Sequence, residues 1–585
     1  MANPVTECRA QWALVLILTI GCILFASCAP PPGHGTLTPS PVLGSMRTSA
    51  FPIETALAFP SITRAIIPVA TNTPRPTVGE LHLAIREDIQ SLNPYLTQNA
   101  SEEFVVSLLY DTLLEIDAHG ELHSSLAEHW NLTPDGSRLA FRLNPQARWH
   151  NGQAVSADDV LFSFDLVRQG GFPGFARMAM LVHRVEAISP MEVEFTLFTT
   201  WPDAVRLLGT GLRIVPAMLW RSVDDPLHYA NLDNPIGTGP FRLAEHVTGK
   251  QFVLRNTGVH HASQPLVNTV ILGIQRDEAK ALKALKEGKL DALGWDIPPD
   301  QARDILNRPE EYKGIRLAEA PGLTTYTLLF NLRTAPFSNQ SFRHALAQAL
   351  DTQGIIDKAL MGFGDAGTPN LFPPASPWHD ADIAPIAFDP QEAAAKLSAA
   401  GFVDRNGDGL RENPDGSMLQ IPIICPKQDT MLKIVELVVA QWGAVGIAAK
   451  TEPKAQDQIM PILMQAQFSV ILHKMSFTEP EMAFFYFHSS RGELRDGQIS
   501  GLNYGGYANL HYDEMVETMQ QVQDPDECRQ LLYELQEVLA ADLPQIPLCV
   551  PRVLNLYRED RFTDWSAQPS LGLLNRMSLC GLRPL

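Results

Sequence analysis

The sequence predicts a mixed α/β protein built from two or three lobes. At 585 residues the chain exceeds the length at which a single hydrophobic core keeps growing, so several cores are expected. From Leu81 onward, short runs with strand character alternate with amphipathic stretches of helical period, which is the pattern of α/β proteins. The composition, with 45% hydrophobic and 19% charged residues, is that of a globular protein and not of a disordered chain.

The first 28 residues have the features of an export signal. The apolar run "WALVLILTIGCILFA", from Trp12 to Ala26, is short for a membrane span and matches the hydrophobic region of a signal peptide. The run leads into "LFASC", which resembles the lipobox of bacterial lipoproteins, where the cysteine is lipidated and becomes the new N-terminus. We therefore expect a lipoprotein signal at 1–28 with lipidation at Cys28; a plain cleaved signal or an uncleaved anchor is the alternative.

Residues 29–79 predict a tether, because they are rich in proline, threonine and serine, as in "PPPGHGTLTPSP". Such a segment cannot bury enough apolar surface to offset the entropic cost of ordering it. A lipid, a tether and a long folded body together predict a protein held on the outer face of the cell membrane, on the periplasmic side where an outer membrane exists.

Charge and motif content narrow the classes of function. The net charge of -20, with no run of clustered Lys and Arg, argues against nucleic acid as a partner. The motifs G-x-S-x-G, H-E-x-x-H and G-x-x-x-x-G-K-[ST] do not occur, so an enzyme is not predicted and no cofactor or metal is expected. Besides Cys28, the expected mature chain holds Cys425, Cys528, Cys549 and Cys580 without C-x-x-C spacing, which argues against a zinc cluster and leaves any disulfide pairing open.

The first elements after the tether are a strand and a helix. The stretch "LHLAIRED" at Leu81 predicts the strand. The stretch "SEEFVVSLLYDTLLEID" predicts a helix that starts at Ser101, with Glu102 and Glu103 in its first turn, where the helix dipole favours negative charge.

The stretch "RWHNGQAVSADDVLFSF", from Arg148 to Phe164, crowds a histidine, two aspartates and three aromatics into one span. "LAFRLN" before it predicts a strand, and the pair Asn151–Gly152 predicts a turn because it tolerates positive φ. Ser156 is placed as a helix N-cap with Asp159 three residues on.

These features give the dense cluster a structural explanation instead of a catalytic one. Asp158 and Asp159 favour the N-terminal end of the helix dipole, while Val160, Phe164 and Val167 fall on one helical face. His150, beside the turn, is expected at the surface or in a hydrogen bond, with metal binding as the lesser alternative.

The same region carries a family resemblance. The stretch "LAEHWNLTPDGSRLAFRLNPQARWHNGQAVSADDVLFSFDLV" resembles the signature of the extracytoplasmic solute-binding proteins of family 5, the oligopeptide- and dipeptide-binding components of ABC transporters. Later segments, among them "PIGTGPFRLAEH", "PFSNQSFRHALAQALD" and "NYGGYAN", extend the resemblance over about residues 80–565. The matching positions of the signature are Ala127, Glu128, Trp130, Asp135, Gly136, Phe141, Trp149, Gly152, Ala157, Asp159, Val160 and Ser163.

The resemblance implies a periplasmic-binding-protein-like fold of type II, in which two α/β lobes joined by two crossing segments close on a ligand. An extra subdomain is inserted in the first lobe. On this chain, lobe I would comprise 80–118, 233–328 and 546–585, the inserted subdomain 119–232, and lobe II 329–545.

The function implied by the resemblance is capture of an oligopeptide or similar polar solute between the lobes and its delivery to the permease subunits of an ABC transporter. A monomer is expected. The alternatives are the same fold binding an oligosaccharide or another non-peptide solute, a ligand sensor, and, remotely, a secreted hydrolase.

The resemblance also implies ligand-binding positions. Peptide-binding members carry an aspartate for the α-amino group of the peptide four residues before an acidic residue and a proline; counting back from Pro480 gives Ser476. A hydroxyl cannot replace a carboxylate beside a buried ammonium, so the resemblance does not bring peptide specificity with it. The other implied positions are Gln98, Tyr326, His473, Lys474, Phe477 and Tyr504; the alternatives are a solvated side chain for Lys474 and the hydrophobic core for Phe477 and Tyr504.

One further motif has two interpretations. "DRNGDGLRENPD", from Asp404 to Asp415, has the D-x-N-x-D-G start of a calcium loop, but it lacks the usual closing glutamate and an evident helix pair. We expect a plain hairpin turn, with bound calcium as the alternative.

Overall fold

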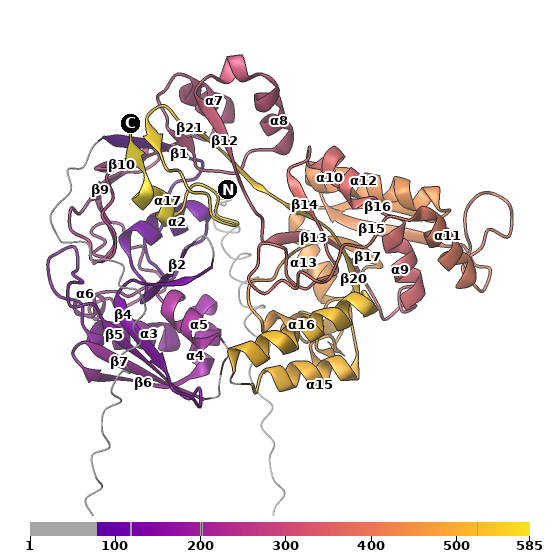
Figure 1. Ribbon diagram of the computed structural model, residues 1–585, viewed down its shortest axis with the longest axis horizontal. Helices are drawn as coiled ribbons and strands as arrows, with labels where there is room; N and C mark the ends of the chain where they lie inside the picture. The colour runs from indigo at the N-terminus through magenta and orange to yellow at the C-terminus, as the bar shows by residue number, and fades with distance from the viewer. Residues whose placement is uncertain (1–78, 118–119, 199–200, 202, 523) are drawn as a thin grey trace, which may run out of the picture. The chain divides into compact units, whose positions relative to one another are not determined.

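The computed structural model describes residues 79–117, 120–198, 201, 203–522 and 524–585 (Figure 1). The predicted signal, Cys28 and nearly all of the predicted tether lie outside these residues. None of the helices in the described ranges combines the length and apolar character that a membrane span needs.

A seven-stranded sheet forms the first part of the described chain (Figure 1). The strand predicted at Leu81 is the first strand along the chain, β1, and it runs parallel to its neighbour on either side in the sheet. The order is β12 (Ile315–Ala320), β21 (Val553–Arg558), β11 (Ala292–Leu293), β1 (Glu80–Ile85), β10 (Thr269–Ile274), β9 (Gln251–Asn256) and β8 (Phe241–Val247). The associated helices are α2 (Ala100–Leu109), α7 (Glu278–Lys286), α8 (Pro299–Asn307) and α17 (Arg576–Gly581).

Helix α2 differs from its prediction at both ends. It begins at Ala100, because the Asn99 side chain accepts the backbone N–H of Glu102 and takes the N-cap. It ends at Leu109, and the following residues form β2 (Leu114–Ile116), paired with β3 (Leu122–Ser124). The apolar period continues past Leu109, but tertiary contacts of the next residues, described below, override it.

A four-stranded antiparallel sheet lies within the predicted insertion. Its order is β4 (Ala127–Leu132), β5 (Arg138–Leu143), β7 (Glu192–Leu197) and β6 (Val182–Ser189), with helices α3 (Ala157–Gln169), α4 (Ala176–Leu181), α5 (Ala204–Thr210) and α6 (Ala217–Trp220). Phe195 stands edge-on between Phe141 and Phe164, joining the sheet to α3. One hydrophobic cluster continues from this sheet into the seven-stranded one.

The predicted strand-to-helix junction forms as expected. Gly152 has a φ of 88° in the turn, and the backbone N–H of Ser156 donates to the Asp159 carboxylate over 2.9 Å. Val160, Phe164 and Val167 are all buried. His150 is hydrogen-bonded, since its ring contacts the carbonyl oxygen of Gly239 at 3.0 Å.

A six-stranded sheet forms the second large part of the described chain. Its order is β14 (Gly364–Ala366), β20 (Gln545–Pro551), β13 (Thr324–Phe330), β17 (Val470–Ser476), β15 (Gln420–Pro426) and β16 (Ala448–Lys454). Helices α9 (Gln340–Gln348), α10 (Thr352–Ala359), α11 (Pro390–Ala399), α12 (Asp429–Ala444) and α13 (Gln456–Met464) belong to it. Trp442 of α12 is fully buried in its core and donates its indole N–H to the Leu346 carbonyl.

A helical layer follows β17. Helix α14 (Met482–Phe487) precedes α15 (Leu510–Met519) and α16 (Pro525–Asp542), which pack side by side (Figure 1). The short elements that remain are β18 (Leu494–Arg495), β19 (Gln498–Ile499), β22 (Phe562–Thr563), β23 (Arg583–Pro584) and the 3-10 turns Pro173–Phe175, Pro309–Tyr312 and Ser489–Arg491.

The chain passes between the two large sheets twice, after β12 and after β20. A Cβ atom on Gly322 would lie 2.1 Å from the carbonyl oxygen of Pro551, so the two connections pack backbone to backbone. Arg552 pairs there with Glu319 of β12 and Asp365 of β14. Two predicted lobe boundaries, 328/329 and 545/546, fall inside β13 and β20, because both strands pair within the six-stranded sheet.

Candidate ligand-binding site

Three of the predicted ligand residues lie together at one end of the β13–β17 ladder. Tyr326 stands directly opposite Lys474, and Thr324 stands opposite Ser476. Because side chains alternate between the faces of a sheet, all four share one face. The hydroxyls of Thr324 and Ser476 are 2.7 Å apart, and the Lys474 ammonium lies 5.3 Å from the centroid of the Tyr326 ring.

Asp296, at the seven-stranded sheet, is an acidic group that acts electrostatically on two of these residues. It follows β11, and its carboxylate accepts the backbone N–H of Leu554 over 2.7 Å. Its charge raises the pKa of Tyr326 and opposes the lowering of the Lys474 pKa by burial. Sequence reasoning missed Asp296, because its charge acts on these residues only in the folded chain.

The protein around these groups changes their acidity. Burial raises the pKa of the Asp296 carboxyl, although the positive charges of Arg86 and Lys474 oppose the effect. Burial lowers the pKa of the Lys474 ammonium and raises that of Tyr326 to about 12. Asp296 and Lys474 nevertheless remain exposed to solvent, so a ligand can reach both side chains.

These polar groups have few protein partners. Within the described part of the chain, neither the Lys474 ammonium nor the Tyr326 hydroxyl takes part in a hydrogen bond, and Asp296 forms no ion pair. Because Asp296 and Lys474 are exposed to solvent, their free hydrogen-bonding positions are open to a bound molecule.

The other predicted residues lie elsewhere. His473 points to the opposite face of the sheet from Lys474, where its ring meets Tyr504 edge-on at 6.4 Å and burial lowers its pKa to about 4. Tyr504 and Phe477 are 5% and 2% exposed and belong to hydrophobic clusters, as the core alternative expects. A ligand contact of these three residues stays a prediction.

Gln98 lies in an exposed loop before α2. The buried carboxylate of Glu102 fixes this loop by accepting the backbone N–H groups of Gln90, Ser91 and Gln98. The sequence indicated Glu102 only as a helix-dipole residue, since its hydrogen bonds depend on the fold of the loop.

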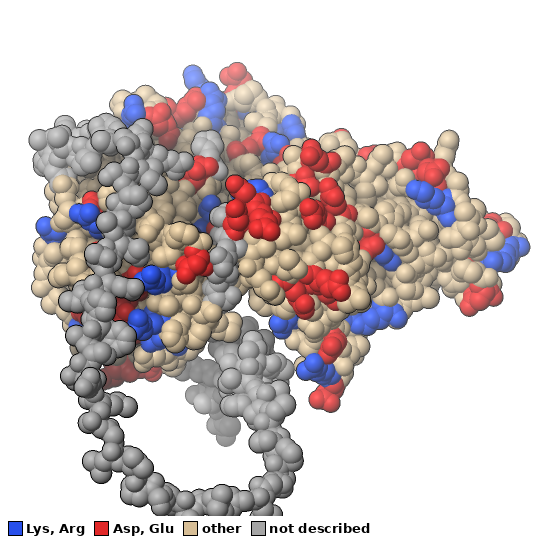
Figure 2. All heavy atoms as spheres, turned by 60° about the horizontal axis from the view of Figure 1, so that its bottom comes forward, with Lys and Arg blue, Asp and Glu red and all other residues tan. Residues whose placement is uncertain are grey.

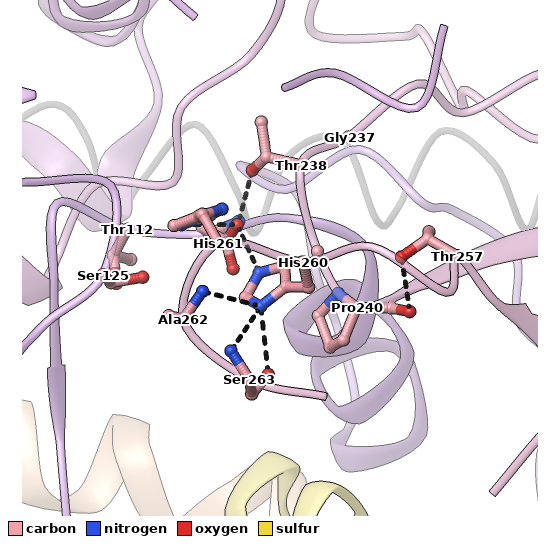
Figure 3. A network of polar contacts seen from close by, with 12 residues as sticks. Thr112, Ser125, Gly237, Thr238, Pro240, Thr257, His260, His261, Ala262 and Ser263 are labelled. Atoms are coloured by element: carbon pink, nitrogen blue, oxygen red, sulfur yellow. Dashed lines mark hydrogen bonds and ion pairs between the residues drawn. The ribbon is translucent and has the colours of Figure 1, made fainter. Parts of the chain in front are cut away.

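A second group of polar side chains lies around the fully buried Asp111 and includes His260 and His261, which Figure 3 shows beside Ser263. Arg576 of α17 lies 2.5 Å from one oxygen of Asp111 and 2.7 Å from Glu115. His260 and His261 lie 3.2 and 3.7 Å from the other oxygen of Asp111. Burial favours the neutral acid, but Arg576 and His260 hold the pKa of Asp111 well below its usual range.

The donor set around Asp111 does not suit a metal ion, although its ligand atoms lie within 4.8 Å of one another. The Nδ1 atom of His260 accepts the backbone N–H of Ser263 over 2.8 Å, and the Arg576 guanidinium lies against one oxygen of Asp111. A second positive charge beside Asp111 would be repelled by the arginine that already pairs with it. The group instead joins the C-terminal helix α17 to the start of β2.

Two other predictions concern possible metal or disulfide chemistry. The predicted hairpin at Asp404 brings the carboxylates of Asp404, Asp408 and Glu412 within 4.8 Å, all near the surface, and backbone N–H groups already occupy Asp404. The cysteines Cys425, Cys528, Cys549 and Cys580 are all free thiols.

Comparison with known proteins identifies the family. The model of the bacterial extracellular solute-binding proteins, family 5, matches residues 121–493. The chain belongs to this family. The family 5 prediction and the predicted fold class are thereby confirmed, and family members are extracytoplasmic binding proteins of ABC transporters rather than enzymes.

Individual family 5 relatives are distant. The chain is 24% identical to the dipeptide-binding protein of Escherichia coli over 80% of this chain and 89% of the relative. It is 24% identical to the nickel-binding periplasmic protein of the same species, over 68% and 75%. The solved ABC transporter substrate-binding protein CtaP of Listeria monocytogenes shares the fold, with a TM-score of 0.74 at 20% identity, covering 87% of this chain and 100% of CtaP.

Proposed function

We propose that this family 5 protein is a lipid-anchored receptor that captures a short peptide or a similar polar solute outside the cytoplasm and delivers it to an ABC transporter permease. The observation that carries the proposal is a set of polar groups from two different sheets: among the described residues, the Tyr326 hydroxyl and the Lys474 ammonium have no hydrogen bond, and Asp296 has no ion pair. Family 5 relatives that bind peptides support it.

The chemistry of the site favours capture over turnover. Tyr326, with its raised pKa, stays a neutral hydrogen-bonding group, and Lys474 and Asp296 offer one charge of each sign. These three groups can bind a polar solute, but they do not form the contacting pair of nucleophile and general base that covalent catalysis requires. The acidic surface, visible as groups of Asp and Glu in Figure 2, is unsuited to polyanionic partners.

A non-peptide solute is the second candidate. Ser476 stands where peptide-binding members place an acid, and its hydroxyl is occupied by Thr324. Relatives named for binding nickel and heme show that the family is not confined to peptides.

Titration calorimetry on the purified protein tests the proposal. Pools of peptides of two to five residues, oligosaccharides, a nickel–histidine complex and heme are titrated separately. The proposal expects saturable heat from the peptide pool and recovery of the peptides unchanged. Binding of another class alone would replace the peptide assignment, and hydrolysis of the peptides would contradict a pure binding role.

The membrane anchor needs its own experiment. Labelling of growing cells with a fatty-acid analogue is expected to mark the wild-type protein and not the Cys28→Ser variant, which should leave the membrane fraction. Equal labelling of both proteins would contradict lipidation at Cys28. A tethered monomer on the outer face of the membrane is the arrangement that this proposal requires.

A further inference from the structure

Phe363 belongs by sequence to the six-stranded sheet but packs in the core of the seven-stranded one. It lies between α10 and β14, and β14 pairs with β20 of the six-stranded sheet. Its side chain is 3% exposed and belongs to the hydrophobic cluster of α8 and β21, together with Ile305 and Leu556. An aromatic ring buries a large apolar area, so this contact attaches the two large sheets to each other.

Two arginines hold the backbone around Phe363. Arg303 of α8 places its guanidinium 4.7 Å from the centroid of the Phe363 ring and donates to the carbonyl oxygen of Met361. Arg552, at the second chain crossing, donates its backbone N–H to the Phe363 carbonyl over 3.2 Å. Residues 361–363 are therefore bound through a side chain and through two backbone carbonyls.

The backbone just after α10 gives this segment its direction. Met361 and Gly362 have φ values of 53° and 84°, in the left-handed region, which ends the helical path and turns the chain toward α8. A Cβ atom on Gly362 would lie 3.2 Å from a guanidinium nitrogen of Arg303, so the glycine leaves room for the arginine. The backbone N–H of Gly362 donates to the Ile356 carbonyl over 3.1 Å, which fixes the turn to α10 as well.

The two chain crossings alone would allow several kinds of motion between the large sheets. They pack against each other at Gly322 and Pro551, and a joint of two adjacent segments can both bend and twist. The Phe363 ring adds a third contact, made by other elements. Twisting would pull this ring out of its cluster, so the third contact opposes the twist and leaves the bend.

We propose that Phe363, held by Arg303, is a non-covalent third joint that stays with the seven-stranded sheet when the sheets move and limits their motion to rotation about the line through this joint and the chain crossings. The inference goes beyond solute capture, since it concerns which motions the two parts can make and is independent of the solute. The segment 361–363 then moves with the seven-stranded sheet, although it is continuous in sequence with α10 and β14.

Distances between two spin labels on the purified protein test the joint. The labels are attached through a ketone-bearing unnatural residue at Lys283 of α7 and Lys433 of α12, two exposed positions on helices of different sheets. This chemistry leaves the free thiols of the chain untouched. Phe363→Ala should broaden the distribution of distances relative to the wild type, because the twist is no longer opposed.

Phe402→Ala is the matched control for loss of packing. Phe402 is 2% exposed, and its ring lies 4.4 Å from that of Phe342 inside the six-stranded sheet's own cluster. This variant should lose stability and keep the wild-type distribution of distances. Phe363→Leu, which keeps part of the apolar contact, and Arg303→Met should each broaden the distribution less than Phe363→Ala, and they carry the test if Phe363→Ala does not fold.

Amide hydrogen exchange on the same proteins locates the change. Phe363→Ala should speed exchange in α8 and at residues 361–363 at least about 100-fold, whereas Phe402→Ala should leave these amides at the wild-type rate. A wild-type distribution of distances in Phe363→Ala would overturn the inference. Equal broadening in Phe363→Ala and Phe402→Ala would overturn it too, since general loss of packing would then account for the motion.

Discussion

Replacing Arg576 with methionine should destabilise the protein by leaving Asp111 as a buried, uncompensated charge. The side chain of Asp111 is 0% exposed and that of Arg576 is 12% exposed, and the pair is 2.5 Å apart. Removing one partner of a buried ion pair costs about 3 to 5 kcal/mol. Because His260 still faces Asp111 at 3.2 Å, we expect the lower end, about 3 kcal/mol.

Urea unfolding followed by tryptophan fluorescence measures this loss, and amide hydrogen exchange shows whether α17 detaches first. Arg583→Met is the matched control, since Arg583 pairs with Asp564 but is 72% exposed and should change the free energy of unfolding by less than about 1 kcal/mol. Asp111→Asn added to Arg576→Met should recover part of the loss. Equal stability of Arg576→Met and Arg583→Met would refute the reasoning.

Three further predictions follow from particular contacts. Burial lowers the pKa of His261 to about 3, so as pH falls below about 6.5 the unfolded chain takes up this proton before the folded chain does. The free energy of unfolding should therefore fall by about 2 kcal/mol between pH 7 and 5 because of His261. If the His261→Gln variant lost as much stability over this pH range as the wild type, the prediction would be contradicted. Gly237→Ala should lower the free energy of unfolding by at least about 3 kcal/mol, because the new Cβ would lie 1.8 Å from the Leu109 carbonyl oxygen. Gly443→Ala in α12, where a Cβ meets open space, should be neutral or stabilising. Equal changes in the free energy of unfolding for the two variants would contradict this prediction. Arg552→Gln should speed amide exchange at both connections between the large sheets and leave global stability within about 1 kcal/mol; unchanged exchange would mean that its ion pairs do not hold these connections.

Local features of the fold could be predicted from the sequence, because their causes lie within a few residues. Ser156 and Asp159 form the predicted capping interaction, and Gly152 takes the predicted positive φ. The end of α2 could not be predicted in this way. Asp111 leaves the helical path where it meets Arg576 and His260, which come from distant parts of the chain.

The residues of the candidate site also differ in how far the sequence could predict them. Tyr326 and Lys474 were implied by resemblance, and the strand register brings them together. His473 is adjacent to Lys474 in sequence but lies on the other face of the strand, which a list of positions cannot show. Asp296 carries no local signal, since its charge acts on Lys474 only in the folded chain.

The central claim, that this family 5 chain captures a polar solute, is tested most directly by mass spectrometry of the small molecules released when the purified protein is denatured. The account predicts a polar solute, near one molecule per chain, that rebinds to the emptied protein. Release of no solute, together with no rebinding of any candidate class, would contradict it.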